Sequence, residues 1–214
     1  MSDGLTELQR LKNLTAMNDR LLYEKVCART KKDLEYLRKK MNATNVVCGV
    51  GPMITELVIV GEAPGAEEDQ QDMPFVGRAG SMLDLLLEES DIDRSKIYLT
   101  NTVKCRPTVN NLGKKNRPPT FDEIQTCKGA LWKELQLIQP KIIIALGSIS
   151  SCLLLKLDQK KIKFGKLVQQ PQFVSYLDTV VYPTWHPSFL LRSDKKYTLL
   201  SLSFFASIAT KVSL

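Results

Sequence analysis

Histidine is almost absent from this chain of 214 residues, and His186 is the single one. Any reaction step that needs an imidazole therefore has one candidate. Long apolar runs are absent too, because the longest, residues 141–147, is far shorter than the ~20 residues of a membrane span. Residues 1–7 lack the basic and apolar segments of a secretory signal. We therefore expect an intracellular protein that is not secreted, in a compartment that the sequence leaves open.

Cysteine occurs five times, an odd number. Without a secretion signal, this count predicts reduced thiols or a metal site rather than a disulfide framework. A hydrophobic share of 43% can bury a full core, and a charged share of 25% is normal for a globular protein. Disorder, collagen and a disulfide-stabilised miniprotein are therefore excluded.

Positive charge predominates, with 30 Lys and Arg residues against 23 Asp and Glu residues and a formal net charge of +7. A basic balance favours polyanionic partners such as nucleic acid or an anionic membrane surface. A basic protein without such a partner has the same composition. Charge alone does not separate these alternatives.

Apolar runs typical of strands alternate with helical patterns from residue 56 onward. We predict strands over residues 57–60, 96–100, 141–146 and 180–184, and helices over residues 5–41, 79–89 and 195–212, with further helices after Thr120 and Gly147. This order predicts a three-layer α/β/α sandwich around a central, mostly parallel four-stranded sheet. We expect a single domain over residues 1–214, with a basic helical N-terminal extension (1–44) and a core (45–214).

Three polar loops leave the ends of predicted strands, at residues 61–69, 101–107 and 185–192. Ligands of parallel sheets bind outside the carboxyl ends of the strands. The sequence therefore predicts a site where these loops meet.

The same three loops carry motifs of a known family. Residues 61–69 read Gly-Glu-Ala-Pro-Gly-Ala-Glu-Glu-Asp and residues 74–80 read Pro-Phe-Val-Gly-Arg-Ala-Gly, which resembles motif A of family 4 uracil-DNA glycosylases. Residues 101–107 resemble the second signature of that family, and residues 185–192, Trp-His-Pro-Ser-Phe-Leu-Leu-Arg, resemble its motif B. The resemblance covers about residues 45–192. It implies a monofunctional DNA glycosylase of base excision repair, which hydrolyses the N-glycosidic bond of deoxyuridine and releases free uracil.

That reaction builds positive charge on the sugar and negative charge on the departing pyrimidine, so it needs a negative or water-orienting group and hydrogen-bond donors. The resemblance implies that Glu68 orients water and that Glu62 lies in the uracil pocket. His186 can donate a hydrogen bond to the uracil while neutral. The alternative for either carboxylate is a capping or solvated role. The expected catalytic residues are Glu68, His186 and Glu62.

A uracil pocket also needs groups that recognise and stack on the base. An amide such as that of Asn101 matches a pyrimidine edge, and Phe75 can stack on the base or can be a core residue. The expected substrate-binding residues are Gly61, Glu62, Ala63, Pro64, Phe75, Asn101 and His186.

A base buried in duplex DNA must be extruded before it enters such a pocket. Leu190 or Leu191 can fill the vacated stack while Arg192 holds phosphate, and we expect one of the two leucines to be core. The expected DNA-binding residues are Leu190, Leu191, Arg192, Arg106, Lys114 and Lys115.

The family normally carries a [4Fe–4S] cluster held by four cysteines, and here Cys105 and Cys127 match two of those positions. The other two fall on Leu34 and Leu37. One interpretation is that Cys27 and Cys48 complete an atypical site with Cys105 and Cys127. The other, which we favour, is that no cluster of the usual type forms. Leu34 and Leu37 are then buried against the Cys105–Cys127 loop, and no cofactor is required for the chemistry.

A second function is compatible with these departures, namely a catalytically weak or inactive glycosylase fold that serves as a DNA-binding or assembly subunit. The altered cysteine pattern and the basic N-terminal helix motivate it. The expected partners are uracil-containing DNA and free uracil as product, with a replication or repair protein as a further candidate and no membrane.

Overall fold

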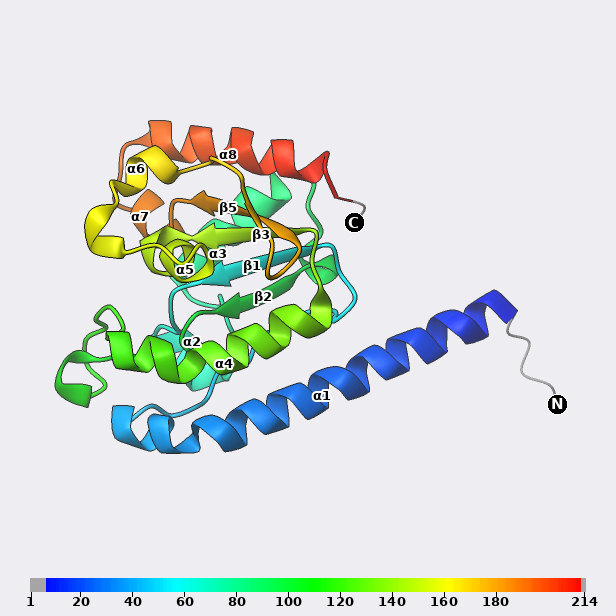
Figure 1. The fold of residues 1–214 in the computed structure, drawn as a ribbon, viewed down its shortest axis with the longest axis horizontal. Helices are drawn as coiled ribbons and strands as arrows, with labels where there is room; N and C mark the ends of the chain where they lie inside the picture. The colour runs from blue at the N-terminus through cyan, green and yellow to red at the C-terminus, as the bar shows by residue number, and fades with distance from the viewer. Residues whose placement is uncertain (1–6, 213–214) are drawn as a thin grey trace.

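The computed structural model describes the backbone of residues 7–212 and the side chains of residues 15–212. A sheet of five strands, in the order β2-β1-β3-β5-β4, lies between layers of helices (Figure 1). The strands are β1 (Leu57–Gly61), β2 (Tyr98–Asn101), β3 (Ile142–Leu146), β4 (Gln172–Val174) and β5 (Thr179–Thr184). The predicted sandwich and its mostly parallel sheet are confirmed. The predicted number of strands is wrong, because the sheet has five rather than four.

The strand that the sequence pattern missed is β4, which pairs antiparallel with β5 at the edge of the sheet. It has only three residues, and Gln172 and Phe173 are both exposed. An edge strand this short has too few residues to show an alternating hydrophobic pattern.

The parallel strands β1 and β3 are buried along their full length. Leu57 and Ile59 of β1 pack into the core on one face of the sheet, and Val58 and Val60 pack into the core on the other. Burial on both faces explains why these strands are continuous apolar runs in the sequence.

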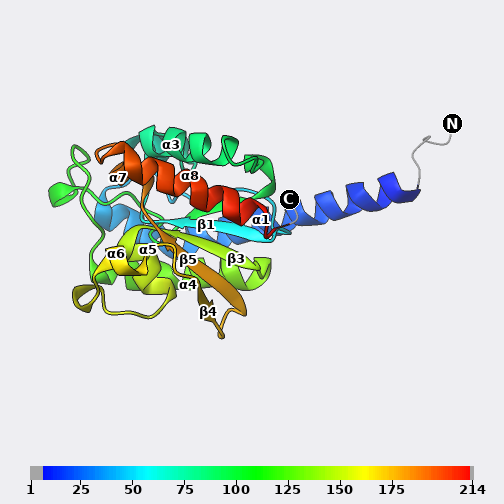
Figure 2. The ribbon, with the colours of Figure 1, turned by 90° about the horizontal axis from the view of Figure 1, so that it is seen from above.

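Helices cover both faces of the sheet (Figure 2). One layer contains α3 (Arg78–Glu88), α7 (Pro187–Leu190) and α8 (Lys195–Ala209), and the other contains α4 (Phe121–Ile138) and α5 (Gly147–Leu154). Short helices α2 (Ala66–Gln71) and α6 (Phe164–Leu167) lie in the connections. Within residues 7–212 no helix combines the length and the apolar character that a bilayer crossing requires.

Local hydrogen bonds set where some elements begin. The Thr120 hydroxyl accepts a hydrogen bond from the Glu123 N–H at 3.3 Å, and the Glu123 carboxylate accepts one from the Thr120 N–H at 2.7 Å. This reciprocal capping box starts α4 where the sequence predicts a helix. Strand β2 begins at Tyr98 rather than at Lys96, because Asp93 caps a 3₁₀ turn over Arg94–Lys96.

Helix α1 (Glu7–Met41) confirms the predicted N-terminal helix within the described residues, and the predicted first residue, Leu5, lies outside them. Its C-terminal part lies along the molecule while its N-terminal part extends beyond the other elements (Figures 1 and 2). Leu34 and Leu37 are each 4% exposed and pack in one apolar cluster with Cys105 and Cys127. The prediction that leucines pack against this loop is confirmed.

Cys27 of α1 and Cys48 of the following connection form a disulfide, with their Cα atoms 5.7 Å apart. The expectation of reduced thiols is therefore wrong for this pair. The interpretation that Cys27 and Cys48 join Cys105 and Cys127 in one site, which we did not favour, is also wrong, because Cys27 and Cys48 are bonded to each other.

Candidate active site

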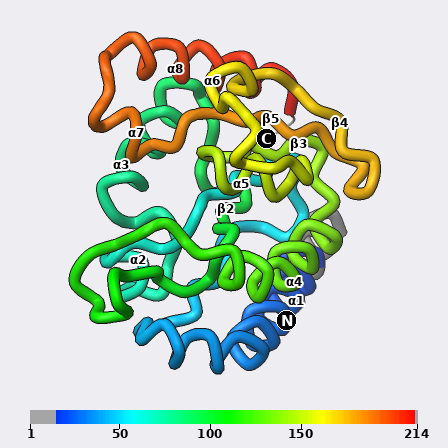
Figure 3. Tube along the Cα trace, turned by 60° about the vertical axis from the view of Figure 1, so that its left-hand side comes forward, coloured from blue at the N-terminus to red at the C-terminus, as the bar shows by residue number. Residues whose placement is uncertain are grey.

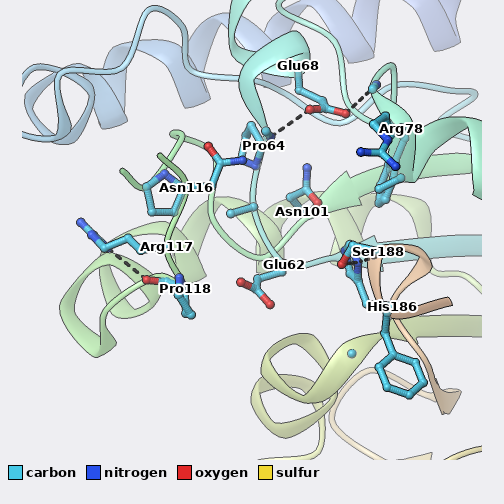
Figure 4. Close-up of a pocket in the computed structure, with 18 of the residues that line it drawn as sticks. Glu62, Pro64, Glu68, Arg78, Asn101, Asn116, Arg117, Pro118, His186 and Ser188 are labelled. Carbon is cyan, nitrogen blue, oxygen red and sulfur yellow. Dashed lines mark hydrogen bonds between the residues drawn. The ribbon is translucent and has the colours of Figure 1, made fainter. Parts of the chain in front are cut away.

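A cavity of about 700 Å³ lies at the carboxyl edge of the parallel strands, and we call it the strand-end cavity (Figure 4). Residues from all three predicted loops line it, so their expected convergence is confirmed. Ala63 and Pro64 belong to its wall, and Ala63 also packs against the leucine cluster of α1.

Gly61 and Asn101 are the last residues of β1 and β2, and they are register partners in the sheet. A Cβ atom at Gly61 would collide with Asn101 Oδ1 and with the Phe75 ring. Only glycine therefore allows the amide and the ring to approach this strand end so closely. Asn101 is 5% exposed and lines the strand-end cavity.

Phe75 is a core residue that also lines the strand-end cavity, so its interpretation as a core residue is confirmed and its stacking on a base stays a prediction. It is 5% exposed, belongs to the core cluster beneath α3, and also lines the strand-end cavity. Its backbone is left-handed (φ 56°), a conformation that is unusual for an aromatic residue. The Arg94 guanidinium holds this bend by donating a 3.0 Å hydrogen bond to the Phe75 carbonyl.

Glu62 follows Gly61 and lines the strand-end cavity, where Figure 4 shows it below Asn101 and to the left of His186. Burial raises the pKa of its carboxyl group above the usual value of 4.5. No group within residues 15–212 donates a hydrogen bond to this carboxylate. Its oxygens are therefore available to a water molecule or a substrate.

Glu68 is 7% exposed, and its carboxylate accepts three backbone hydrogen bonds. One oxygen accepts from the Gly65 N–H at 2.9 Å, and the other accepts from Val76 and Gly77 at 3.1 and 2.9 Å. These bonds close the α2 turn and fasten the start of α3. The structure therefore places Glu68 in the capping role that the sequence left as its alternative, although Glu68 does reach the cavity wall.

The neighbouring acids Glu67 and Asp69 have different environments. The Asp69 carboxylate accepts hydrogen bonds from the N–H groups of Thr44, at 3.0 Å, and Asn45, at 2.9 Å. Asp69 thus anchors the connection that follows α1. Glu67 is exposed in the first turn of α2.

His186 ends the loop after β5 and caps α7. Its Nδ1 accepts a hydrogen bond from the Ser188 N–H at 3.2 Å and lies 2.9 Å from the Ser188 hydroxyl. Burial, and then the positive charge of Arg192, lower the pKa of His186 to about 4. The ring is therefore neutral near neutral pH, and because Nδ1 is an acceptor, the proton lies on Nε2.

The two leucines at the C-terminal end of α7 differ clearly in burial. Leu190 is 3% exposed and packs in the core, whereas Leu191 is 38% exposed. The prediction that Leu190 contacts DNA is therefore corrected, since its side chain is not at the surface. Arg192 is exposed and lines the strand-end cavity.

Basic residues of the connection between β2 and α4 lie near the same cavity. Lys114 and Lys115 are exposed, as DNA contacts require. Arg106 is half-buried, and its Nε donates a 2.8 Å hydrogen bond to Asn116 Oδ1. Arg117 is held by Glu123 through two hydrogen bonds of 2.7 and 2.8 Å.

The sequence analysis assigned no role to several residues that line the strand-end cavity. They are Arg78, Asn116, Arg117, Pro118, Ser148, Phe164, Trp185 and Ser188. Ser148 could have been found, because it follows β3, another parallel strand that ends at the same edge. Phe164 comes from the short helix α6, and no pattern in the sequence connects it with the other loops.

The thiols of this chain do not fit a four-thiolate cluster. Cys105 and Cys127 are both fully buried, and the positions beside them on α1 hold leucines without metal-binding atoms. Burial raises the pKa of the Cys105 and Cys127 thiols, which opposes the thiolate form that ligates iron. Within residues 15–212 no group of three or more His, Cys, Asp or Glu side chains could hold a metal ion. Cys152 is buried in α5, as expected of a core residue.

The sequence of this chain is similar to a known protein family and to several known proteins. The model of the uracil DNA glycosylase superfamily matches residues 48–210. A type-4 uracil-DNA glycosylase of Thermotoga maritima is 44% identical over 154 residues, which are 72% of this chain and 75% of that protein. A type-4 uracil-DNA glycosylase of Sulfurisphaera tokodaii is 34% identical over 165 residues, 75% of this chain and 72% of that protein. A DNA polymerase of Bacillus phage SP01 is 32% identical over 150 residues, 69% of this chain but 15% of the polymerase.

Proposed function

The chain belongs to the uracil DNA glycosylase superfamily, and from this membership we propose that its strand-end cavity holds the uracil that the enzyme removes from DNA. The reaction is hydrolysis of the N-glycosidic bond of deoxyuridine, which releases free uracil and leaves an abasic site. The type-4 relatives do not favour the alternative of an inactive assembly subunit.

We assign the water-orienting role to Glu62 rather than to Glu68. The Glu62 carboxylate faces the cavity without a hydrogen-bond donor from the protein, whereas both oxygens of Glu68 accept backbone hydrogen bonds. A carboxylate beside the sugar also stabilises the positive charge that develops there. Glu62 therefore serves both the attacking water and the sugar, while Glu68 holds α2 and α3 in place.

The departing uracil gains negative charge, which His186 and Asn101 can stabilise. The Nε2–H of neutral His186 donates to a uracil carbonyl oxygen, and this needs no proton transfer to the base. The Asn101 amide offers a donor and an acceptor that match the pyrimidine edge. The Phe75 ring, beside Asn101, supplies a face on which the base can stack.

Residues at the rim of the strand-end cavity can contact DNA. Leu191 is the exposed leucine that can fill the space left by the extruded base, and Arg192 beside it can hold phosphate. Arg106, Lys114 and Lys115 extend the positive rim.

The observation that carries this proposal is the meeting of Glu62, Asn101 and His186, from three different strand ends, in one cavity. Replacing His186 with Ala should lower uracil excision by about 10²-fold or more, the usual effect of losing one donor to a developing anion. The measurement is the rate at which alkali-labile sites form in a uracil-containing oligonucleotide. Near-normal turnover of His186→Ala would show that the assigned pocket is wrong, provided that circular dichroism shows a folded variant.

A further inference from the structure

A second cavity, of about 560 Å³, lies between the first half of α4 and the end of α5, and we call it the lysine-rimmed cavity. Figure 2 shows these two helices on the same side of the sheet, and Figure 3 shows them near each other along the Cα trace. Apolar side chains form much of its wall, namely Phe121, Ile124, Ile149, Leu153 and Leu157. Phe121 is 72% exposed, so one face of its ring is open to a ligand.

The lysine-rimmed cavity directly adjoins the strand-end cavity. Pro118 lines the strand-end cavity and Pro119 lines the other, and the same is true of Ser148 and Ile149. The side chain of Gln159, from the lysine-rimmed cavity, donates a 2.9 Å hydrogen bond to the Ser148 hydroxyl. The walls of the two cavities are therefore built in part from residues that are adjacent in the chain or hydrogen-bonded to each other.

The charge of the lysine-rimmed cavity suits a polyanion. Lys128, Lys156 and Lys160 line it, and none of them is ion-paired with a carboxylate in the part of the chain whose side chains are described. Lys128 and Lys156 lie over aromatic rings, 5.8 Å from the Trp132 centroid and 3.6 Å from the Tyr176 centroid.

Asp158 is the one acid among the residues that line this cavity. Its carboxylate already accepts the Lys160 N–H at 3.0 Å and lies 3.7 Å from Lys161 Nζ. The cavity therefore keeps a net positive charge toward a ligand.

We propose that the lysine-rimmed cavity binds an unpaired nucleotide of the same DNA strand whose uracil enters the strand-end cavity. This inference rests on the proposed function. The base stacks on the open face of Phe121 beside Leu157, and the lysines attract the neighbouring phosphates. Stacking on this ring needs a base with a free face, which single-stranded DNA provides and a paired, stacked duplex does not. The site therefore favours uracil in single-stranded DNA.

The test compares Phe121→Ala with Phe173→Ala, a matched change of an exposed aromatic residue on the edge strand β4 (72% and 66% exposed). Each variant is assayed on a single-stranded oligonucleotide with one deoxyuridine, and on the same oligonucleotide shortened stepwise from either end. We expect Phe121→Ala to raise KM about 5-fold or more on the long substrate, the scale of one lost base–aromatic contact. We expect no such difference on the substrate shortened from the end that reaches the cavity. Phe173→Ala should behave as the unmodified protein on both.

Two results would overturn the proposal. One is that Phe121→Ala has the same KM as Phe173→Ala on every substrate. The other is that Phe121→Ala raises KM equally on the long and the shortened oligonucleotides. A failure of the proposed function itself is distinguishable, because then the unmodified protein would release no uracil from any substrate. Replacing Lys128 and Lys160 with Ala gives an independent measurement, in which DNA binding by fluorescence anisotropy should become less dependent on salt concentration.

Discussion

Glu62 and Glu68 both follow β1 in the chain, yet their carboxylates meet different partners. Glu62 faces the strand-end cavity with free oxygens, and Glu68 accepts three backbone N–H groups. A carboxylate whose oxygens are already bonded to the backbone is poorly placed to orient water. This difference motivates the assignment of roles, and it can be tested with the same substitution at both positions.

Glu62→Gln should lower turnover by about 10²–10⁴-fold, the usual contribution of a general base, while binding to uracil-containing DNA is retained. Glu68→Gln instead turns an amide NH₂ toward backbone donors, so we expect a loss of about 1–3 kcal/mol in the free energy of unfolding. Excision rates, DNA binding and thermal melting measure these effects. A Glu68→Gln variant with unchanged melting temperature and abolished turnover would return the water-orienting role to Glu68.

The protonation states of Glu62 and His186 predict how activity depends on pH. Activity needs Glu62 ionised and His186 neutral, and both conditions fail as the pH falls. Burial raises the pKa of Glu62 above 4.5 and lowers the pKa of His186 to about 4, so Glu62 should set the acid limb of the kcat/KM profile.

His186 is also the only histidine in the chain, so its ring signals can be followed by NMR without assignment by mutagenesis. The folded protein binds this proton at a pKa of about 4, whereas the unfolded chain binds it near 6.5. The unfolded state therefore takes up the proton first, and the free energy of unfolding should fall as the pH decreases from about 6.5 to about 4. A His186 signal that titrates near 6.5 in the folded protein would contradict this.

At the scale of elements, α1 is attached to the rest of the molecule without the usual cluster ligands. Leu34 and Leu37 pack with Cys105 and Cys127 in one apolar cluster, and the Cys27–Cys48 disulfide joins α1 to the connection before β1. Asp69 anchors the start of the same connection through the backbone of Thr44 and Asn45. Apolar packing, one covalent bond and buried hydrogen bonds together hold the helix.

Leu34 and Leu37 fall where the family resemblance implies two cluster ligands, so we predict that cysteines at these positions would allow the chain to bind a cluster. Protein purified without oxygen should contain little or no iron. The double variant Leu34→Cys and Leu37→Cys places four thiols in the same apolar cluster, so anaerobic reconstitution with iron and sulfide should load about four iron atoms per chain. The control is the double variant Leu34→Ser and Leu37→Ser, which reduces the side-chain volume by a similar amount. Its hydroxyl groups bind iron more weakly than thiolates do, so it should remain free of iron. Iron in the unmodified protein that is lost in Cys105→Ser would contradict the prediction.

A buried ion pair is a further feature of the elements around this cluster. Lys104 Nζ donates to the Glu134 carboxylate at 2.7 Å, and the two side chains are 0% and 1% exposed. The Thr100 hydroxyl also donates to this carboxylate, at 2.8 Å. The network joins β2, the loop that carries Cys105, and α4, and so it positions the second sequence motif relative to the sheet.

At the scale of the whole molecule, segments that are far apart in the sequence form one functional edge. The strand-end cavity combines loops after β1, β2, β3 and β5 with the connection before α4 and the helix α6. The lysine-rimmed cavity continues this edge, and the net charge of +7 suits a DNA strand that runs across both cavities.

The sequence by itself determined the chain order of four of the five strands and of the longer helices, the sandwich, and the loops that form the site. Continuous apolar runs such as Leu57–Val60 and local signals such as Thr120 with Glu123 report on the residues' immediate neighbours along the chain. The three motifs lie at strand ends, and parallel strands bring those ends to one edge. These features depend on local pattern and on chain direction, which is why they were predictable.

The tertiary structure alone decided which member of each similar pair has which role. Glu62 and Glu68 differ in their hydrogen-bond partners, Leu190 and Leu191 differ in burial, and Cys27 bonds to Cys48 rather than joining Cys105. The lysine-rimmed cavity likewise depends on how α4 packs beside α5. Each of these outcomes is set by contacts between residues distant in the chain, and the free energy of such contacts has no signature in the local sequence pattern.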